Sequence, residues 1–210
     1  MSGETSQTLD RGLLVLELLA EEAGGLGVTE LARRLRVNRT VVYRLLTTLE
    51  QHGLARRDGS GRARLGLGVL QLSRRVQPLL RQAATPVLRA LAEDVGATGH
   101  LTLADGEEAL AVAVVEPTWT DFHVAYRVGS RHPLDRGAAG RAILAGRTGD
   151  GSPQRTSGEL QPGAYGIAAA VLGVPAVEAS VGVVALADLD DEAASAAVLR
   201  AAAEVARRLS

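Results

Sequence analysis

Apolar side chains recur at helical spacing near the start of the chain and predict three consecutive helices. Leucines place the first helix over residues 9–22, and the second covers 28–35. We expect Glu30, at the third position of the second helix, to oppose the helix dipole and bind free backbone N–H groups. The third helix spans residues 39–51, and the side chain of Asn38 is expected to cap it.

The third helix leaves one face polar, and that face carries Arg, Thr and Tyr side chains close to its beginning. After Gly53, two short basic runs, residues 54–57 and 62–65, flank the turn sequence Asp58-Gly-Ser-Gly61. This arrangement predicts a β-hairpin, the wing of a winged helix-turn-helix. In such a unit the second helix of the pair lies in the major groove of double-stranded DNA.

The stretch after the wing keeps helical spacing but contains Pro78 and Pro86. Because proline interrupts a helix, we expect two helices, near residues 67–76 and 85–95. The predicted organisation is a winged helix-turn-helix at residues 1–66, a linker helix at 67–84 and a second domain at 85–210.

Beyond Gly96 the pattern changes to the alternation that is typical of strands. Residues 99–104 and 108–116 predict two strands joined by a turn at Asp105-Gly106. Further strands are expected at 122–128, 167–172 and 180–186, with a short helix beginning at 137 and a terminal helix at 190–209. This order predicts an α+β domain with a mainly antiparallel sheet.

Charge is distributed unevenly along the chain. Residues 28–64 contain nine arginines against Glu30, Glu50 and Asp58, a net charge of +6, so the rest carries −7 to reach the total of −1. A basic patch on the third helix and the wing favours DNA binding. The expected DNA-contacting residues are Asn38, Arg39, Thr40, Tyr43, Arg44, Arg56, Arg57, Arg62 and Arg64. The alternative is a winged helix that docks another protein, with arginines that are only solvated surface.

Composition excludes several classes of site. The chain has no cysteine, which rules out disulfides and cysteine-based zinc sites. Its four histidines lack metal-ligand spacing, and it has no phosphate-binding or dinucleotide-binding glycine motif and no Gly-x-Ser-x-Gly sequence. We therefore expect neither an enzyme nor a bound cofactor. No apolar stretch is long enough to span a bilayer, so we expect a cytoplasmic protein without membrane contact.

The order of motifs resembles the IclR family of bacterial transcription regulators over nearly the whole chain. The resemblance rests on Arg11-Gly-Leu-Leu-Val-Leu-Glu17, Val28-Thr-Glu-Leu-Ala32, Thr40-Val-Val-Tyr-Arg-Leu-Leu46, Val128-Gly-Ser-Arg-His-Pro-Leu134 and Gly137-Ala-Ala-Gly-Arg-Ala-Ile-Leu-Ala145. It implies a winged helix-turn-helix, a GAF-like C-terminal domain that binds a small effector such as an aromatic or carboxylic acid, and a homodimer or tetramer. The implied function is transcription regulation, as a repressor, through operator DNA.

Two features depart from the family's pattern. Between Ala145 and Gly158 the family has a longer, largely helical stretch, whereas this chain has a short polar segment. We expect residues 146–162 to form a mobile loop and leave the pocket open, which favours a bulky aromatic effector or none. Relatives that bind small keto acids have a cysteine where this chain has Gly166, so a keto-acid ligand is not favoured.

The resemblance places the effector pocket behind a small-residue turn. Ala138, Ala139 and Gly140 open a helix there, where backbone N–H groups can hold a carboxylate, although small residues also serve tight packing. Glu159 is expected to tie down a loop. The expected effector-contacting residues are His100, Trp119, Ala138, Ala139, Gly140, Glu159, Tyr165, Gly166 and Gly182. The alternative is a DNA-binding protein without a ligand, whose C-terminal domain serves oligomerisation.

Overall fold

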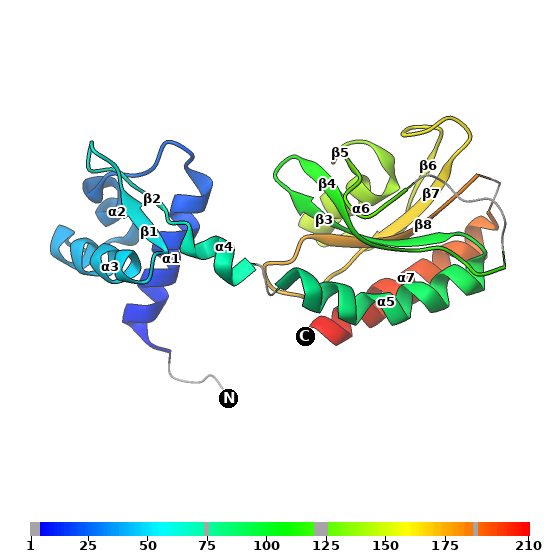
Figure 1. The fold of residues 1–210 in the computed structure, drawn as a ribbon, viewed down its shortest axis with the longest axis horizontal. Coiled ribbons are helices and arrows are strands. Elements are labelled where there is room, and N and C mark those ends of the chain that lie inside the picture. Colours follow the sequence, from blue (N-terminus) through cyan, green and yellow to red (C-terminus); the bar gives the residue numbers. More distant parts are fainter. Residues whose placement is uncertain (1–4, 74–75, 120–125, 187–188) are drawn as a thin grey trace. The chain divides into compact units, whose positions relative to one another are not determined.

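The computed structural model describes residues 5–73, 76–119, 126–186 and 189–210. The chain forms two compact units, Met1–Val76 and Gln77–Ser210, shown in Figure 1. Each unit has its own core, so the two are described separately.

The first unit is a three-helix bundle closed by a hairpin and followed by a short helix. Its elements are α1 (Gln7–Glu21), α2 (Val28–Leu35), α3 (Arg39–Gln51), β1 (Ala55–Arg57), β2 (Ala63–Leu65) and α4 (Gly68–Ser73). Val15, Leu31, Val42 and Leu46 are fully buried where the three helices meet. The predicted winged helix-turn-helix is confirmed.

Local hydrogen bonds explain where α3 and the hairpin begin and turn. The Asn38 side-chain oxygen accepts the Val41 N–H at 2.9 Å, which confirms the predicted cap of α3. Asp58 Oδ1 accepts the N–H groups of Ser60 and Arg62 at 3.0 and 3.1 Å, which folds the turn between β1 and β2. An isolated bridge between Leu26 and Ala63 joins the hairpin to the loop between α1 and α2.

The second unit is a six-stranded antiparallel sheet with helices on both faces. Its helices are α5 (Val76–Val95), α6 (Gly137–Arg147) and α7 (Asp191–Leu209). Its strands are β3 (Thr98–Asp105), β4 (Glu108–Val115), β5 (Arg131–Pro133), β6 (Gln154–Ser157), β7 (Tyr165–Ala170) and β8 (Ala179–Ala185). The strand order is β5-β4-β3-β8-β7-β6, and every pairing is antiparallel.

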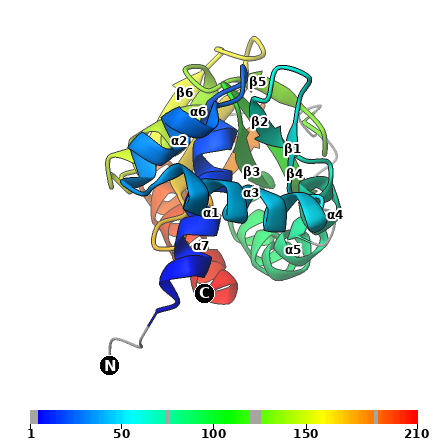
Figure 2. The ribbon, with the colours of Figure 1, turned by 90° about the vertical axis from the view of Figure 1, so that its left-hand side faces the viewer.

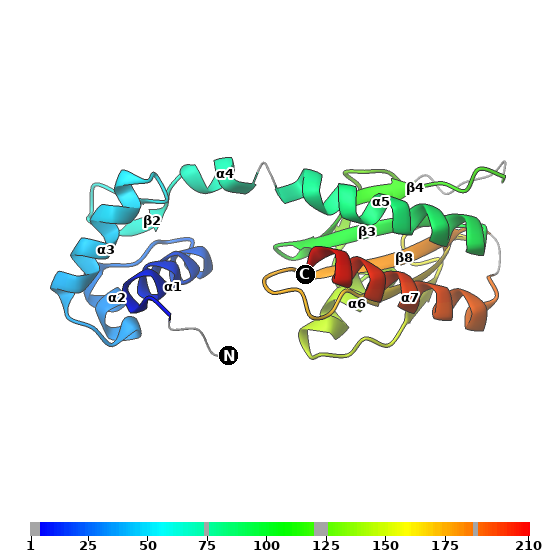
Figure 3. The same cartoon turned by 90° about the horizontal axis from the view of Figure 1, so that it is seen from below.

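The two faces of this sheet carry different helices. In Figures 1 and 3, α5 and α7 lie side by side across one face. Leu88 of α5, Val198 of α7 and the strand residues Leu101, Ile167 and Val181 form the main core there. On the other face α6 packs on β7, where Ala138, Ala142 and Ala168 are buried together. The predicted α+β class is therefore confirmed.

Two helices follow the wing, as predicted, but α5 begins at Val76 and not near residue 85. It runs unbroken past Pro78 and Pro86. Pro78 lies in the first turn, where backbone N–H groups have no partner within the helix. Pro86 lies inside the helix, but the packing of Ala84 and Leu88 on the sheet stabilises the segment on both sides of it.

Two edge strands were also not predicted. Strand β5 contains Pro133, which an edge strand tolerates, and β6 lies within the segment 146–162 that was predicted to be a mobile loop. Strand β6 pairs with β7 over four residue pairs, so that prediction was wrong for residues 154–157. Of the predicted strand at 122–128, residues 126–128 are not in a strand and the rest lies outside the described residues.

Candidate nucleic-acid interface and ligand cavity

Helix α3 presents an exposed polar face on the first unit. It runs across the front of this unit in Figure 2, with β1 and β2 beside it. Arg39, Thr40, Tyr43 and Arg44 are exposed, while residues 42, 45, 46 and 49 are buried beneath them. In the described part of the chain neither Arg39 nor Arg44 has an ion pair. Their guanidinium groups are therefore available to phosphates or base edges.

The four arginines of the wing differ in the partners that they bind within the protein. Arg56 is exposed and has no ion pair among the described residues. Arg57 pairs with Glu50 of α3 at 2.6 Å, which raises the pKa of the guanidinium. Arg64 pairs with Asp58 at 3.2 Å and donates to the Ala23 carbonyl at 2.7 Å.

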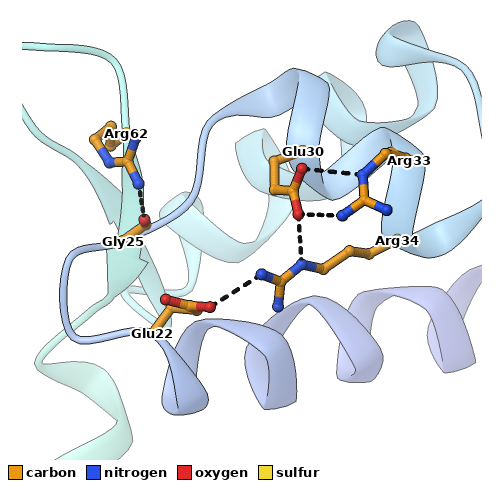
Figure 4. A network of polar contacts seen from close by, with 6 residues as sticks. All are labelled: Glu22, Gly25, Glu30, Arg33, Arg34 and Arg62. Carbon is orange, nitrogen blue, oxygen red and sulfur yellow. Dashed lines mark hydrogen bonds and ion pairs between the residues drawn. The ribbon is translucent and has the colours of Figure 1, made fainter.

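Arg62 is also held by the protein. Its Nε atom donates to the backbone carbonyl of Gly24 at 3.1 Å. Its Nη2 atom donates to the backbone carbonyl of Gly25 at 2.5 Å (Figure 4). Arg62 and Arg64 thus fasten the wing to the loop between α1 and α2. These bonds use two of the five N–H donors of each guanidinium, so DNA contact by Arg62 and Arg64 stays a prediction.

A second network, also drawn in Figure 4, joins α1 and α2. Glu30 accepts hydrogen bonds from Arg33 and Arg34, with shortest distances of 2.6 and 2.8 Å, and Arg34 also binds Glu22 at 2.9 Å. The hydrogen bonds from Arg33 and then Arg34 lower the pKa of Glu30 to about 2. The expectation that Glu30 binds the start of its helix was wrong, because its carboxylate is taken up by these arginines.

Sequence reasoning did not place Arg36 in the DNA-contacting set. Arg36 ends α2 with a left-handed backbone (φ 53°) and precedes Asn38 by one residue. Its side chain is exposed and has no ion pair among the described residues. The sequence shows that Arg36 precedes α3. Only the structure shows that no described carboxylate forms an ion pair with its side chain.

The second unit contains a cavity of about 230 Å³ beside the start of α6. It lies on the α6 face of the sheet, between β3, β7, β8 and two loops. Five residues of the predicted effector-contacting set line it: His100, Ala138, Ala139, Glu159 and Gly166. The other described lining residues are Tyr126, Ser130, Arg131, His132, Thr156, Leu160, Gln161, Ala164, Val183 and Val184.

His100 belongs to a cluster of polar side chains in this cavity. Its Nδ1 is 3.1 Å from Thr102 Oγ1, and its ring contacts Tyr126 edge-on at 5.1 Å between centroids. The Tyr126 hydroxyl lies 3.4 Å from Thr102 Oγ1 and 3.5 Å from His132 Nε2. Burial, and then the nearby His132, lower the pKa of His100 to about 3, so its imidazole is neutral. Burial also raises the pKa of Tyr126.

Two N–H groups at the amino-terminal end of α6 are bound by the protein's own side chains. The Gly137 N–H donates to Glu159 Oε2 at 3.0 Å and the Ala138 N–H donates to Thr156 Oγ1 at 3.1 Å. Glu159 also pairs with Arg141 at 2.9 Å. Of the three expected residues only Ala138 has its N–H taken by another residue, so a carboxylate site at Ala139 and Gly140 stays a prediction.

Two expected effector contacts serve close packing instead. A Cβ at Gly140 would lie 2.4 Å from the Leu134 carbonyl oxygen, so Gly140 allows α6 to approach the preceding loop. A Cβ at Gly182 would lie 2.8 Å from His100 Cε1, so Gly182 leaves room for the imidazole. Neither glycine lines the cavity.

Both expected aromatic contacts lie away from the cavity. Trp119 is 64% exposed, and its Nε1 donates to the Glu93 carbonyl at 3.4 Å, near the end of α5. Tyr165 shares the sheet face of Ile167 and lines a separate shallow hollow with Arg155 and Asp191. Both expectations are therefore corrected. Among the described residues no group of acidic or histidine side chains could hold a metal ion, and no helix could cross a membrane.

A winged helix-turn-helix followed by an antiparallel sheet with a cavity defines a class, the two-domain winged-helix proteins. Two family models narrow this class. The IclR helix-turn-helix domain matches residues 8–59, and the bacterial transcriptional regulator IclR C-terminal domain matches residues 76–154. The chain belongs to the IclR family of bacterial transcription regulators, as its motifs had indicated.

Individual relatives agree with this assignment. The chain is 32% identical to the regulator KipR of Bacillus subtilis, over 67% of this chain and 56% of that protein. It is also 32% identical to the acetate operon repressor of Salmonella typhimurium, over 66% of this chain and 52% of that protein. The chain thus spans about half the length of these relatives, which are transcription regulators rather than enzymes.

The fold also has solved counterparts. An IclR homolog from Microbacterium hydrocarbonoxydans, solved in complex with 4-hydroxybenzoate, matches with a TM-score of 0.56 and 19% identity. The match covers 97% of this chain and 99% of that one. At this identity the likeness shows the shared fold of both units.

Proposed function

We propose that this protein is a transcription repressor that binds operator DNA through α3 and releases it when a small effector binds the cavity beside α6. The observation that carries the DNA-binding part is the exposed face of α3. There Arg39 and Arg44 have no ion pair in the described chain, whereas the arginines of α2 are paired with Glu30. Such a face can donate to base edges and phosphates in a major groove.

The remaining parts of the proposal have separate support. Arg56 and Arg36 are exposed beside α3 and are proposed to contact the phosphate backbone, while Asn38 holds the start of α3. The cavity of about 230 Å³ supports a small effector. The 4-hydroxybenzoate bound to the Microbacterium homolog and the repressor among the relatives support the same assignment. We place this regulator in the cytoplasm, in contact with the DNA it controls.

We also propose that the protein acts as a dimer or a dimer of dimers. One winged helix contacts few base pairs, so useful specificity requires two copies on a repeated or palindromic site. Leu9, Leu13 and Leu14 of α1 are between 40% and 63% exposed, which is a continuous apolar face on the first unit. This face is the proposed contact between copies.

Selection from random duplexes tests this function. The full chain should enrich one sequence with two related half-sites and bind it at least about a thousandfold more tightly than unrelated DNA. A protein that binds all duplexes alike, or none, would contradict the proposal.

A second candidate function is a DNA-binding protein whose C-terminal unit serves only assembly. The observation that favours it is the protein's own Glu159 at the start of α6, where an acidic effector was expected. A screen for ligands that raise the melting temperature distinguishes the two, since a molecule that binds the folded state stabilises it.

A further inference from the structure

Strand β4 contains a β-bulge at Val112. Its neighbours Ala111 and Ala113 pair with consecutive residues of β3, Thr102 and Leu101, so Val112 has no partner residue on that strand. The bulge also interrupts the alternation of β4, because Val112 and Ala113 follow each other and yet both belong to the core beneath α5 and α7. A bulge disrupts the ladder locally and often lies beside a functional site.

One side of the bulge is bound by α5. The Arg81 Nε atom donates to the Val112 carbonyl oxygen at 3.2 Å. Arg81 lies in the second turn of α5, and no carboxylate in the described part of the chain forms an ion pair with it. Helix α5 begins at the boundary between the two units, and residues 74 and 75 alone separate it from α4. Arg81 therefore connects the bulge to the beginning of the helix that follows the first unit in sequence.

The other side of the bulge is bound by the wall of the cavity beside α6. The Ala111 N–H donates to the Ser130 carbonyl at 3.0 Å, and the Gly129 N–H donates to the Ala111 carbonyl at 2.8 Å. Ser130 lines the cavity. Thr102, opposite Ala111 in the ladder, lies 3.4 Å from the hydroxyl of Tyr126, another lining residue. A displacement of this wall would therefore reach Ala111 and the bulge next to it.

We propose that Arg81 is a positioning residue of the effector response, which couples the wall of the cavity to the start of α5 through the Val112 carbonyl. The proposal rests on the proposed effector function and deepens it, because it names a residue that transmits the response without lining the cavity. The alternative is that Arg81 only supplies a hydrogen bond to the bulge. In that case its removal would lower the stability of the second unit and leave the response intact.

The reciprocity of coupling allows a test before the effector is identified. If an effector weakens operator binding, the operator weakens effector binding by the same factor, so operator binding must also act on the cavity. The probe is therefore the duplex selected from random DNA, and the measurement is hydrogen–deuterium exchange of the full chain with and without it. We expect the operator to change exchange at Ala111 and Gly129 by about fivefold, the lower end of usual coupling between sites. An unrelated duplex should leave it unchanged.

The variant Arg81→Met removes the N–H donors and keeps an unbranched side chain on α5. We expect it to bind the operator and to lose the change in exchange at Ala111 and Gly129. Arg89→Met is the matched control, because Arg89 is an exposed arginine of the same helix and has no hydrogen bond or ion pair with any described residue. Its response to the operator should equal that of the wild type.

The possible results separate the proposal from the proposed function. If the operator binds the wild type without changing exchange at these amides, or changes it equally in Arg81→Met, the proposal is overturned and DNA binding stands. A response lost in Arg89→Met as well would also overturn it, since the effect would not belong to the bond to Val112. If the wild type selects no duplex, the proposed function fails, and the proposal fails with it.

Discussion

His100 is a buried titratable side chain of the second unit whose protonation affects stability. It lies on β3 between Thr102 and Tyr126, and burial lowers the pKa of its imidazole to about 3. The same group in an unfolded chain has a pKa of about 6.5. Between these values the unfolded chain binds a proton that the folded protein does not.

The second unit should therefore lose stability on acidification. Because the unfolded state binds the extra proton, the free energy of unfolding falls as the pH drops below about 6.5. We expect His100 to account for a loss of about 2 kcal/mol between pH 7 and pH 5. His100→Asn, which can still bind Thr102, should remove this part of the pH dependence, as measured by urea unfolding with Trp119 fluorescence.

The exposed His52 provides the control for this prediction. His52→Asn should leave the pH dependence of the second unit as it is in the wild type. An unchanged pH dependence in His100→Asn would show that His100 is not the buried neutral group.

The sequence does not show which arginines of the wing bind other groups of the protein and which do not. Arg56 and Arg62 both lie in a basic hairpin, which the sequence does predict. The partners of Arg62 are carbonyls of residues 24 and 25, which tertiary folding brings beside the wing. The ion pair of Glu159 with Arg141 was not predicted either, because tertiary folding brings the two residues together from separate elements.

At the scale of elements, the wing combines two functions. Arg62 holds the hairpin to the α1–α2 loop through a hydrogen bond to the Gly25 carbonyl. Arg56, on β1, is exposed. The two arginines have the same charge and lie in the same hairpin. They therefore form a matched pair of positions for separating stability from DNA binding.

Arg56→Ala and Arg62→Ala should have different effects. Arg56→Ala should weaken binding to all duplexes alike and reduce the slope of log K against log salt by about 1, because one phosphate contact is lost. Arg62→Ala should lower the stability of the first unit by about 1 kcal/mol through the lost hydrogen bonds to Gly24 and Gly25. Thermal unfolding and salt-dependent binding measure these effects. A normal melting temperature for Arg62→Ala would contradict its assigned role.

Elements with clear apolar periodicity were predicted well, and polar edge elements were not. The hairpin of β3 and β4 was found from alternation and its Asp105-Gly106 turn. Strand β6 was missed because Gln154–Ser157 has no apolar alternation, and an edge strand needs only the backbone of β7. The first half of α5 was not predicted, because the packing that stabilises a helix across its prolines comes from distant strands.

At the scale of the whole molecule, the exposed apolar face of α1 predicts self-association. Leu9 and Leu13 are 63% and 51% exposed, although α1 buries its other side in the core. The double variant Leu9→Gln with Leu13→Gln keeps the charge unchanged. We expect it to shift the protein toward monomer in sedimentation experiments at micromolar concentration and to weaken operator binding.

Leu172→Gln is the control for this experiment. Leu172 is 40% exposed in the second unit, and its replacement should leave both the assembly and the operator affinity unchanged. A wild-type protein that stays monomeric with and without DNA would contradict the proposed assembly.

The central claim is that the exposed face of α3 reads DNA sequence. Arg39 lies at the first position of α3, is exposed and has no ion pair in the described chain. Arg200 of α7 is a charge-matched control, since it is equally an arginine on a helix surface but belongs to the second unit.

The most direct measurement is the ratio of affinities for the selected operator and an unrelated duplex, at one salt concentration, for the wild type, Arg39→Ala and Arg200→Ala. We predict that Arg39→Ala lowers this ratio by the equivalent of about 1–3 kcal/mol, because a base contact is lost. Arg200→Ala should leave the ratio unchanged. A ratio for Arg39→Ala equal to that of the wild type would contradict the assignment of α3 as the reader.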